Sequence, residues 1–259
     1  MDAAAARAER FAQYPSLRER CVFVTGGASG IGADIVRAFV AQGARVGFAD
    51  LDADAARPLM EACGDDRAAF HAADLSRPAE LAQALAHARA RFGDIDVLVN
   101  NVANDRRHGL QEVDEAFFEW SVAVNLKPAF FASQWVAPGM QARGGGSIVN
   151  VGSTGWKNKV AGYPMYATCK SAMTGLTRSL ARELGAHRIR VNTLTPGWVM
   201  TERQRRLWVD EAGERAMDEH QCLPGRIVGA DIAAMALFLA ADDSRMVTAQ
   251  EFVVDAGWS

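Results

Sequence analysis

Residues 21–32 read CVFVTGGASGIG, a β-branched run that leads directly into a glycine-rich turn. The run at 21–25 predicts a buried strand, and a helix is expected to start within the turn. Gly26, Gly30 and Gly32 have no Cβ atoms to keep a pyrophosphate group from the backbone, and the start of a helix offers free N–H groups and a positive dipole end. The stretch therefore favours a phosphate site between a strand and a helix; the alternative is an ordinary tight turn.

The same rhythm of strand and helix continues along the chain. Further runs rich in apolar and β-branched residues predict strands at 45–50, 67–74, 96–101, 147–153, 189–196 and 251–257. Segments with the spacing of amphipathic helices lie between them, as at 79–92, 115–141 and 166–184. The alternation predicts an α/β fold, a doubly wound parallel sheet of seven strands with helices on both faces. Since no linker or repeat divides the chain, we expect an N-terminal arm at 1–20 and a single domain at 21–259.

One interval interrupts this rhythm. Residues 197–225 separate the sixth predicted strand from the next helix, whereas connections in α/β units usually span only a few residues. The interval follows the carboxyl end of a strand, which is where open α/β sheets bind their ligands. We therefore expect residues 197–225 to form a lid over a substrate.

Composition and charge indicate a small-molecule partner. The chain is 49% apolar and its formal net charge is -3 at pH 7, so neither nucleic acid nor an anionic membrane is expected to bind. The longest apolar run, 232–241, is about half as long as a membrane-spanning helix. The cysteines and histidines show no metal-ligand spacing, and the first residues lack the apolar core of a secretory leader. We expect a cytoplasmic protein with reduced thiols and no metal site.

Asp50 ends the second predicted strand, about twenty residues beyond the glycine turn. An acid at that place is positioned to accept hydrogen bonds from the ribose hydroxyls of an adenosine, and its charge would repel a 2′-phosphate. Residues 26–32 contain no Lys or Arg to attract such a phosphate. These observations favour NAD over NADP as the cofactor. The alternative is that Asp50 caps a helix that starts near Asp52.

A second motif lies at residues 162–170, which read GYPMYATCK. Tyr166 and Lys170 share one helical face there, because residues four apart in a helix are neighbours. Such a pair can carry out proton chemistry. Tyr163 has no lysine four positions along, and we expect it to be a wall or helix-entry residue ahead of Pro164, which can begin a helix.

These motifs occur in an order that is typical of one family. They are TGxxxGxG after the first strand, Asn100-Asn101 after the fourth, Ser153 after the fifth, Tyr166-x-x-x-Lys170, and Pro196-Gly197 after the sixth. The combination resembles the short-chain dehydrogenases/reductases over roughly residues 17–259. The resemblance implies a Rossmann-type catalytic domain and an NAD(P)-dependent oxidoreductase in which a tyrosine is the general acid/base.

The role of Tyr166 can also be argued from chemistry. Oxidation of an alcohol needs a base that takes the hydroxyl proton while a hydride leaves the same carbon for the nicotinamide. A free tyrosine has a pKa near 10. The Lys170 cation and the charge of the nicotinamide are expected to favour the phenolate and to lower that pKa. Ser153 is expected to hold the substrate oxygen. Thr154 could donate equally, but neighbouring strand residues point to opposite faces, so only one of the two is expected in the site.

The resemblance implies roles for further residues. Lys170 is expected to hydrogen-bond the nicotinamide ribose, and Asn125 to join Lys170 to solvent through a water; the alternative for Asn125 is a polar residue that bends its helix. Asp74 is placed to meet the adenine amino group. The expected catalytic residues are Ser153, Tyr166, Lys170 and Asn125. The expected cofactor contacts are Gly26, Ser29, Gly30, Ile31, Gly32, Asp50, Leu51, Asp74, Leu75, Asn101, Tyr166, Lys170, Pro196, Gly197, Val199 and Thr201.

Longer stretches narrow the resemblance. They are YPSL (14–17), NDRRH (104–108), VAPGM (136–140), QCLPGRIV (221–228) and DAGW (255–258). Together they look like the bacterial aldose 1-dehydrogenases of the D-xylose and L-arabinose type, which oxidise the anomeric hydroxyl of a cyclic sugar to a lactone. Val102 and Ala103 depart from the NNAG of many members, so the backbone there is expected to lie slightly differently.

A polar pocket mouth suits a sugar. Polar groups after the fourth strand can bond several hydroxyls, an aromatic ring can pack on the C–H face, and lid residues can close over it. The expected substrate contacts are Asn104, Asp105, His108, Trp156, Arg203, Gln204 and Trp208. Trp156 is expected to pack on a pentose or 6-deoxyhexose. Arg106, Arg107, Arg205 and Arg206 are expected to be solvated.

Three functions from different classes remain open. The leading one is an NAD-dependent sugar 1-dehydrogenase. The second is another short-chain enzyme, such as a 3-oxoacyl reductase or a hydroxy-acid or steroid dehydrogenase. A long apolar substrate would need an apolar pocket rim, whereas residues 104–108 are polar. The third is a dinucleotide-binding sensor without catalysis, which should have lost Ser153, Tyr166 or Lys170. Apolar residues on several faces of the predicted long helices, together with the resemblance, imply a homotetramer.

Overall fold

The computed structural model describes residues 12–259, and its centre is a single seven-stranded sheet. The strands lie in the order β3-β2-β1-β4-β5-β6-β7, and every neighbouring pair is parallel. They are β1 (Cys21–Thr25), β2 (Arg45–Asp50), β3 (Ala68–Ala72), β4 (Val97–Asn100), β5 (Gly146–Val151), β6 (Ile189–Pro196) and β7 (Glu251–Val254). The predicted parallel sheet is confirmed.

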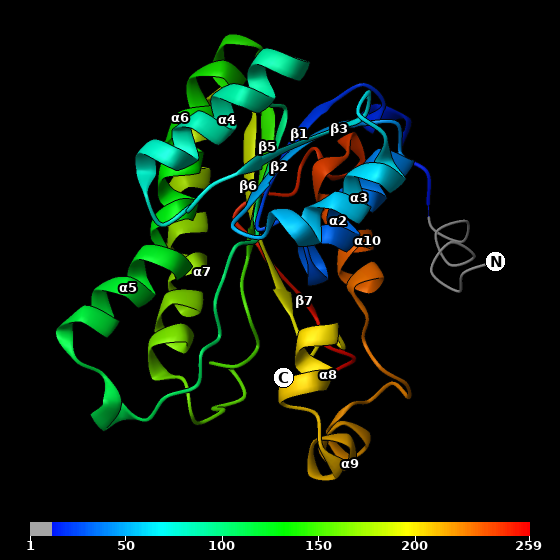
Figure 1. Cartoon of the computed structure of the whole chain (residues 1–259). Helices are drawn as coiled ribbons and strands as arrows, with labels where there is room; N and C mark the ends of the chain where they lie inside the picture. The colour runs from blue at the N-terminus through cyan, green and yellow to red at the C-terminus, as the bar shows by residue number, and fades with distance from the viewer. Residues whose placement is uncertain (1–11) are drawn as a thin grey trace.

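Helices cover both faces of this sheet (Figure 1). On one face lie α2 (Gly30–Ala41), α3 (Ala53–Cys63) and α10 (Gly229–Ala240). On the other lie α4 (Pro78–Phe92), α6 (Lys127–Ala142) and α7 (Pro164–Leu184), with α5 (Glu115–Asn125) packed on α6 and α7. Alternate side chains of β1 enter the two cores, because successive strand residues point to opposite faces. The doubly wound α/β class is therefore confirmed.

The long amphipathic segment at 115–141 is two helices rather than one. α5 ends at Asn125, and Leu126 leaves the helical region with φ -130° and ψ -48° before α6 begins. Pro128 explains the break, since proline has no N–H to donate to the preceding turn and its ring clashes with the carbonyl four residues earlier. Asn125 thus sits at the end of a helix.

α7 begins at Pro164, two residues before the start expected from periodicity. Proline is favoured at the first helical position because its missing N–H has no partner there in any case. The helix carries Tyr166 and Lys170 one turn apart, as predicted.

The predicted N-terminal arm is partly outside the described residues, which begin at 12. Its described part contains the short 3₁₀ turn η1 (Pro15–Leu17), and Leu17 is 1% exposed among the side chains of the α2 and α10 face. The remaining 3₁₀ turns are η2 (Leu110–Glu112), η3 (Gly185–His187) and η4 (Asp242–Ser244).

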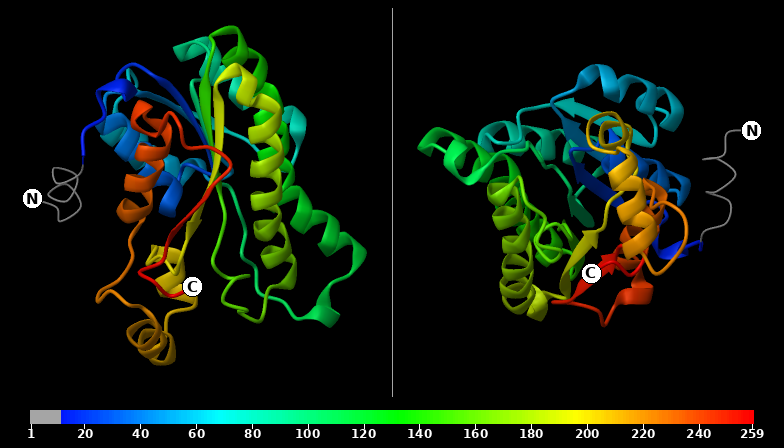
Figure 2. Two further views of the ribbon diagram at one scale, coloured as in Figure 1. Left: turned by 180° about the vertical axis from the view of Figure 1, so that it is seen from behind. Right: turned by 90° about the horizontal axis from the view of Figure 1, so that it is seen from below.

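The long connection after β6 folds into α8 (Glu202–Leu207) and α9 (Glu211–His220). Both helices project beyond the carboxyl ends of the strands, and the C-terminal end of the chain lies close to α8 (Figures 1 and 2). Among residues 12–259, no helix combines the length and apolar character needed to cross a membrane.

Candidate active site

A cavity of about 620 Å³ runs along the carboxyl ends of the strands. Its walls come from the segments that follow β1, β2, β3, β4, β5 and β6, and from α7, α8 and the C-terminal end. This volume is in the range of small-molecule sites. The parallel sheet gathers these segments because all its strands end at the same edge.

The glycine turn forms one end wall. Ser29 is the N-cap of α2, yet its side chain makes no capping hydrogen bond, so the first N–H groups of the helix have no side-chain acceptor. Gly26 has φ +67°, and a Cβ there would come within 2.8 Å of the Val102 Cα. A Cβ on Gly32 would overlap the Gly26 carbonyl oxygen. The uncapped helix start and the missing Cβ atoms fit a phosphate-bearing cofactor.

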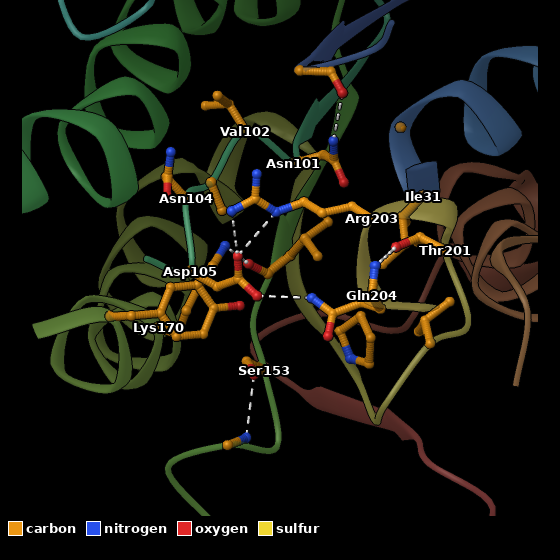
Figure 3. A pocket seen from close by; sticks show the side chains of 18 of the residues that line it. Ile31, Asn101, Val102, Asn104, Asp105, Ser153, Lys170, Thr201, Arg203 and Gln204 are labelled. Carbon is orange, nitrogen blue, oxygen red and sulfur yellow. Dashed lines mark hydrogen bonds and ion pairs between the residues drawn. The ribbon is translucent and has the colours of Figure 1, made fainter. Parts of the chain in front are cut away.

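Asn101 holds this turn against β4 (Figure 3). Its Nδ2 donates to the carbonyls of Thr25 (3.1 Å) and Gly26 (2.8 Å). The hydroxyl of Thr25 accepts the backbone N–H groups of Asn101 (2.9 Å) and Val102 (3.1 Å) in return. Val102, the departure from the common NNAG pattern, packs directly against Gly26, where only glycine leaves room for it.

Asp50 faces the glycine turn. Its Oδ2 accepts the N–H of Ala28 (3.1 Å) and its Oδ1 that of Asp52 (3.3 Å). The cap of α3 is Asp52 itself, whose Oδ1 accepts the N–H of Ala55 (2.9 Å). The alternative interpretation of Asp50 as the helix cap is therefore wrong, and its carboxylate lines the pocket beside the exposed Leu51.

Asp74 also lines the pocket, two residues past the end of β3. Its Oδ1 accepts the N–H (3.0 Å) and the hydroxyl (2.7 Å) of Ser76, and its Oδ2 lies 3.4 Å from Nε of Arg77. Leu75 beside it is buried. The carboxylate is therefore fixed in a turn with a neighbouring cation.

Tyr166, Ser153 and Lys170 meet in the pocket wall. Ser153 accepts the N–H of Gly155 at 3.1 Å and is hydrogen-bonded to the Tyr166 side chain. Lys170 is 2% exposed, and its Nζ donates to the Val151 carbonyl (2.7 Å) and lies 6.0 Å from the centroid of the Tyr166 ring. The structure thus brings together the three residues predicted from spacing.

The charges of this group differ from expectation. Burial raises the pKa of Tyr166, and the charge of Asp105 raises it further. The hydrogen bond with Ser153 and the charge of Arg107 lower this pKa, but by less than burial raises it. Burial also lowers the pKa of Lys170 to about 8. The predicted lowering of the Tyr166 pKa is therefore not produced by the protein's own groups, because the phenolate loses more from lost hydration than it gains from them.

Asn125 is buried at the end of α5 and organises the loop after β4. Its Oδ1 accepts the N–H of Asn104 (2.8 Å), and its Nδ2 donates to the Ser121 carbonyl (3.0 Å). The alternative of a polar residue at a helix bend therefore describes its position well.

The predicted substrate contacts divide into two groups. Asn104, Asp105, Arg203 and Gln204 line the pocket. Asp105 accepts from Nη2 (3.1 Å) and Nε (3.3 Å) of Arg203 through Oδ1, and from Nε2 of Gln204 (2.7 Å) through Oδ2 (Figure 3). The loop after β4 and helix α8 are thereby tied together across the pocket.

His108, Trp156 and Trp208 do not line the pocket, so the structure does not bring these three predicted substrate contacts to the site. His108 is buried, with Nδ1 bonded to the Arg106 carbonyl (2.9 Å) and Nε2 accepting the N–H of Met165 (3.2 Å). The Trp156 ring lies against Lys157, whose Nζ is 4.7 Å from its centroid.

Several lining residues were missed. Arg107 was predicted to be solvated but lines the pocket, and Trp198 and Trp258 line it as well, with ring centroids 6.4 Å apart. Thr154 also lines it, because it lies beyond the end of β5, where strand alternation no longer applies. The motif DAGW contained Trp258 but gave no sign that the C-terminal end reaches the pocket.

The chain is similar in sequence to a reductase family and to known sugar dehydrogenases. The family model described as Enoyl-(Acyl carrier protein) reductase matches residues 26–259. A probable galactose dehydrogenase of Rhizobium meliloti is 45% identical over 95% of this chain and 97% of its own. D-xylose 1-dehydrogenase of Caulobacter vibrioides is 43% identical over 95% of this chain and 98% of its own.

Two solved structures share the fold. A short-chain type dehydrogenase/reductase from Mycobacterium ulcerans matches with a TM-score of 0.88 at 27% identity, covering 94% of this chain and 90% of its own. A blue fluorescent protein from a metagenomic library, solved in complex with NADPH, matches with a TM-score of 0.85 at 35% identity, covering 94% and 99%. Because the family model matches from the glycine turn to residue 259 and the relatives cover more than nine-tenths of the chain, this protein belongs to the short-chain dehydrogenase/reductase family and is an oxidoreductase that binds a nicotinamide cofactor.

Proposed function

We propose that the protein oxidises the anomeric hydroxyl of a cyclic aldose, a pentose or 6-deoxyhexose, to a lactone, with NAD as the cofactor. The observation that carries the proposal is the Ser153–Tyr166 pair beside Lys170 in a pocket rimmed by polar side chains. The galactose and D-xylose dehydrogenases among the relatives support a sugar. The polar rim argues against the long apolar substrates of the alternative short-chain enzymes.

The protein's own residues bind the substrate and move the proton. Ser153 Oγ holds the reacting hydroxyl, and the Tyr166 phenolate takes its proton. Lys170 stands behind Tyr166 and holds the cofactor ribose, while Asn125 keeps the loop after β4 in place. The nicotinamide, when bound, supplies the acceptor for the hydride and a positive charge.

The cofactor occupies the end of the pocket formed by the glycine turn. Gly26, Ser29, Gly30, Ile31 and Gly32 face its pyrophosphate. The other contacts are Asp50, Leu51, Asp74, Leu75, Asn101, Pro196, Gly197, Val199 and Thr201. In support, every residue of the two sets except Gly30 lines the one cavity, and Gly30 lies between two that do.

The preference for NAD rests on Asp50. The charged residues of the pocket wall at the ends of β2 and β3 are the carboxylates Asp50, the last residue of β2, and Asp74, two residues past β3. The nearby Arg77 is paired with Asp74 and Glu80. A 2′-phosphate there would meet like charge, whereas ribose hydroxyls can donate to Asp50. The NADPH-bound relative makes this preference the first property to measure.

The remaining parts of the proposal concern the whole chain. Residues 21–259 form one catalytic domain in which 197–225 is the lid, and Asn104, Asp105, Arg203 and Gln204 contact the sugar. The enzyme is a homotetramer. It works in the cytoplasm, in keeping with four cysteines that are all free.

The test is an absorbance assay for reduced nicotinamide with a panel of aldoses, each with NAD and with NADP. We expect a pentose or 6-deoxyhexose to be oxidised faster with NAD than with NADP, and the product to be trapped as a lactone by hydroxylamine. Turnover of 3-oxoacyl or steroid substrates without any sugar activity would overturn the proposal. Equal rates with the two cofactors would overturn its NAD part alone.

A further inference from the structure

Arg107 is a charged residue of the pocket wall to which the functional proposal gives no role. It lies in the pocket wall after β4. Its guanidinium carbon is 4.0 Å from the centroid of the Tyr163 ring and 5.0 Å from that of Trp208. Tyr163 is itself 6% exposed, so it provides a fixed surface. The planar cation is therefore held between two aromatic rings, one directly before α7 and one directly after α8.

The backbone around Arg107 is anchored to the start of the helix that carries Tyr166. The N–H of His108 donates to the Gly162 carbonyl (2.8 Å), and Nε2 of His108 accepts the N–H of Met165 (3.2 Å). Since Nε2 accepts, Nδ1 carries the proton and donates to the Arg106 carbonyl (2.9 Å). These bonds fix the loop, and so Arg107, relative to Tyr166.

The donors of Arg107 lack acceptors. Within residues 12–259 its side chain makes no hydrogen bond or ion pair, and its Nε is buried without a partner. Arg203 on the same pocket wall is different, because Asp105 neutralises it. A guanidinium carries five N–H donors, and leaving buried donors unpaired is costly. A rigid, unpaired fork of donors in a ligand pocket is suited to a ligand with neighbouring oxygen atoms.

We propose that Arg107 is a specificity-determining residue that binds two neighbouring hydroxyl oxygens of the sugar ring through paired N–H groups. The inference rests on the proposed aldose oxidation. Adjacent ring hydroxyls present two acceptors at a spacing that a planar guanidinium can bridge. Because the aromatic rings already hold Arg107 in place, little conformational entropy is lost when the sugar binds.

The cation also acts on Tyr166. Arg107 favours the phenolate, whereas Asp105 disfavours it. Replacing Arg107 should thus affect binding through the hydrogen bonds and the pH profile through the charge. Lysine at this position keeps the charge but loses the planar fork, so it separates the two effects.

The test compares Arg107→Met and Arg107→Lys with wild type on the best aldose from the screen. We expect Arg107→Met to raise KM by roughly 10- to 100-fold, the range of a lost pair of charged hydrogen bonds, and to move the pH profile to higher pH. Arg107→Lys should show a raised KM with a pH profile close to wild type. The dissociation constant for NAD, measured by calorimetry, should be unchanged in both.

Arg106 supplies the matched control. It is the neighbouring arginine, it is exposed, and it packs over Phe117, with its guanidinium carbon 5.4 Å from the ring centroid and outside the pocket wall. Arg106→Met should leave KM within twofold of wild type. If Arg106→Met and Arg107→Met raise KM equally, the effect comes from a general loss of positive charge, and the inference is overturned.

Deoxy sugars identify the hydroxyls. An analogue that lacks a hydroxyl bound by Arg107 should be a poor substrate for wild type and should suffer little further loss in Arg107→Met. If Arg107→Met impairs every deoxy analogue as much as the parent sugar, no hydroxyl is shared and the inference fails. A wild-type preference for a uronic acid that disappears in Arg107→Met would show a carboxylate to be the partner and would also overturn it.

The same assays separate this inference from the proposed function. If wild type oxidises no aldose, both fail. If wild type oxidises aldoses and Arg107→Met matches its KM, only the role of Arg107 fails.

Discussion

Tyr166 and Lys170 lie in surroundings that disfavour the charged form of each. Burial raises the pKa of the tyrosine and lowers that of the lysine to about 8. The hydroxyl of Tyr166 must nevertheless become a phenolate to act as a base. The residues thus supply geometry and a hydrogen bond from Ser153, and the positive charge of the bound nicotinamide is needed to complete the electrostatics.

The hydroxyl of Tyr166 should be indispensable for turnover. Tyr166→Phe keeps the ring but removes the proton acceptor, so we expect kcat to fall by about 10²- to 10⁴-fold with an unchanged dissociation constant for NAD. Tyr14→Phe is the matched control, because Tyr14 does not line the pocket. A Tyr166→Phe enzyme with wild-type kcat would remove this residue from catalysis.

The raised pKa of Tyr166 predicts an alkaline optimum for oxidation. Below that pKa the phenolate fraction falls about tenfold per pH unit, and the rate should fall with it. Steady-state kinetics between pH 6 and 10 at saturating NAD, in buffers of constant ionic strength, measure this slope. A rate of oxidation that is flat between pH 6 and 8 would contradict the prediction.

Lys170 should lower stability at neutral pH. Its folded pKa of about 8 is below its ordinary value of 10.5, so the unfolded chain binds more protons between these values and stability rises with pH across that window. Below about pH 8 the full cost of burying the charged lysine is present, about 3 kcal/mol of unfolding free energy from the pKa difference. The hydrogen bond to the Val151 carbonyl offsets about 1 kcal/mol of this cost. Lys170→Met should therefore be about 2 kcal/mol more stable at pH 7 and lose that advantage near pH 10.5.

Urea unfolding of Lys170→Met and wild type at the two pH values measures this difference. Since the variant lacks the residue that supports Tyr166, it should also be inactive. If Lys170→Met is less stable than wild type, and by the same free energy at pH 7 and at pH 10.5, then burying the charge of Lys170 does not destabilise the fold.

At the scale of the elements, the attachment of the proposed lid depends on one carboxylate. Asp105 accepts three hydrogen bonds from α8, and its side chain is 17% exposed, so water competes little for them. Asp105→Asn removes the charge that Arg203 needs. We expect faster trypsin cleavage at the exposed Arg203, Arg205 and Arg206, together with a several-fold rise in KM for the sugar.

The exposed pair on α9 provides the control for this lid experiment. Glu211 lies 3.6 Å from Arg215 with a side chain that is 95% exposed, and such surface pairs contribute little. Glu211→Gln should leave the cleavage rate of the lid unchanged. Identical cleavage of Asp105→Asn and wild type would show that the bonds to α8 do not hold the lid.

The sequence predicted those elements whose signal is local. The seven strands are apolar runs between turn residues, and Pro164 marks the start of α7 directly. The break at Leu126 was missed because the amphipathic pattern continues on both sides of it. Contacts between distant segments left no trace in the sequence, as when Asp105 pairs with Arg203. Arg106 and Arg107 are adjacent residues of the same type, so the sequence alone does not distinguish them. Arg107 lies in the pocket wall because its side chain packs against Tyr163 and Trp208.

At the scale of the molecule, an apolar surface remains on α5 and α6. Phe118, Phe130 and Phe131 are 50%, 48% and 37% exposed. A homotetramer would bury them, and light scattering should give four times the chain mass. Replacing Phe130 and Phe131 with serine should lower that mass, since the apolar contact is lost. A wild-type monomer at micromolar concentration would contradict the proposed assembly.

The two pocket tryptophans make the enzyme its own optical reporter. Trp198 and Trp258 line the same pocket as Tyr166, and a reduced nicotinamide ring absorbs light at the wavelengths at which indole emits. Binding of the reduced cofactor should quench the intrinsic fluorescence through energy transfer. Because His220 of α9 stacks on Trp258 with ring centroids 5.3 Å apart, movement of the lid should change the same signal, so occupancy and closure can be followed in real time without a dye.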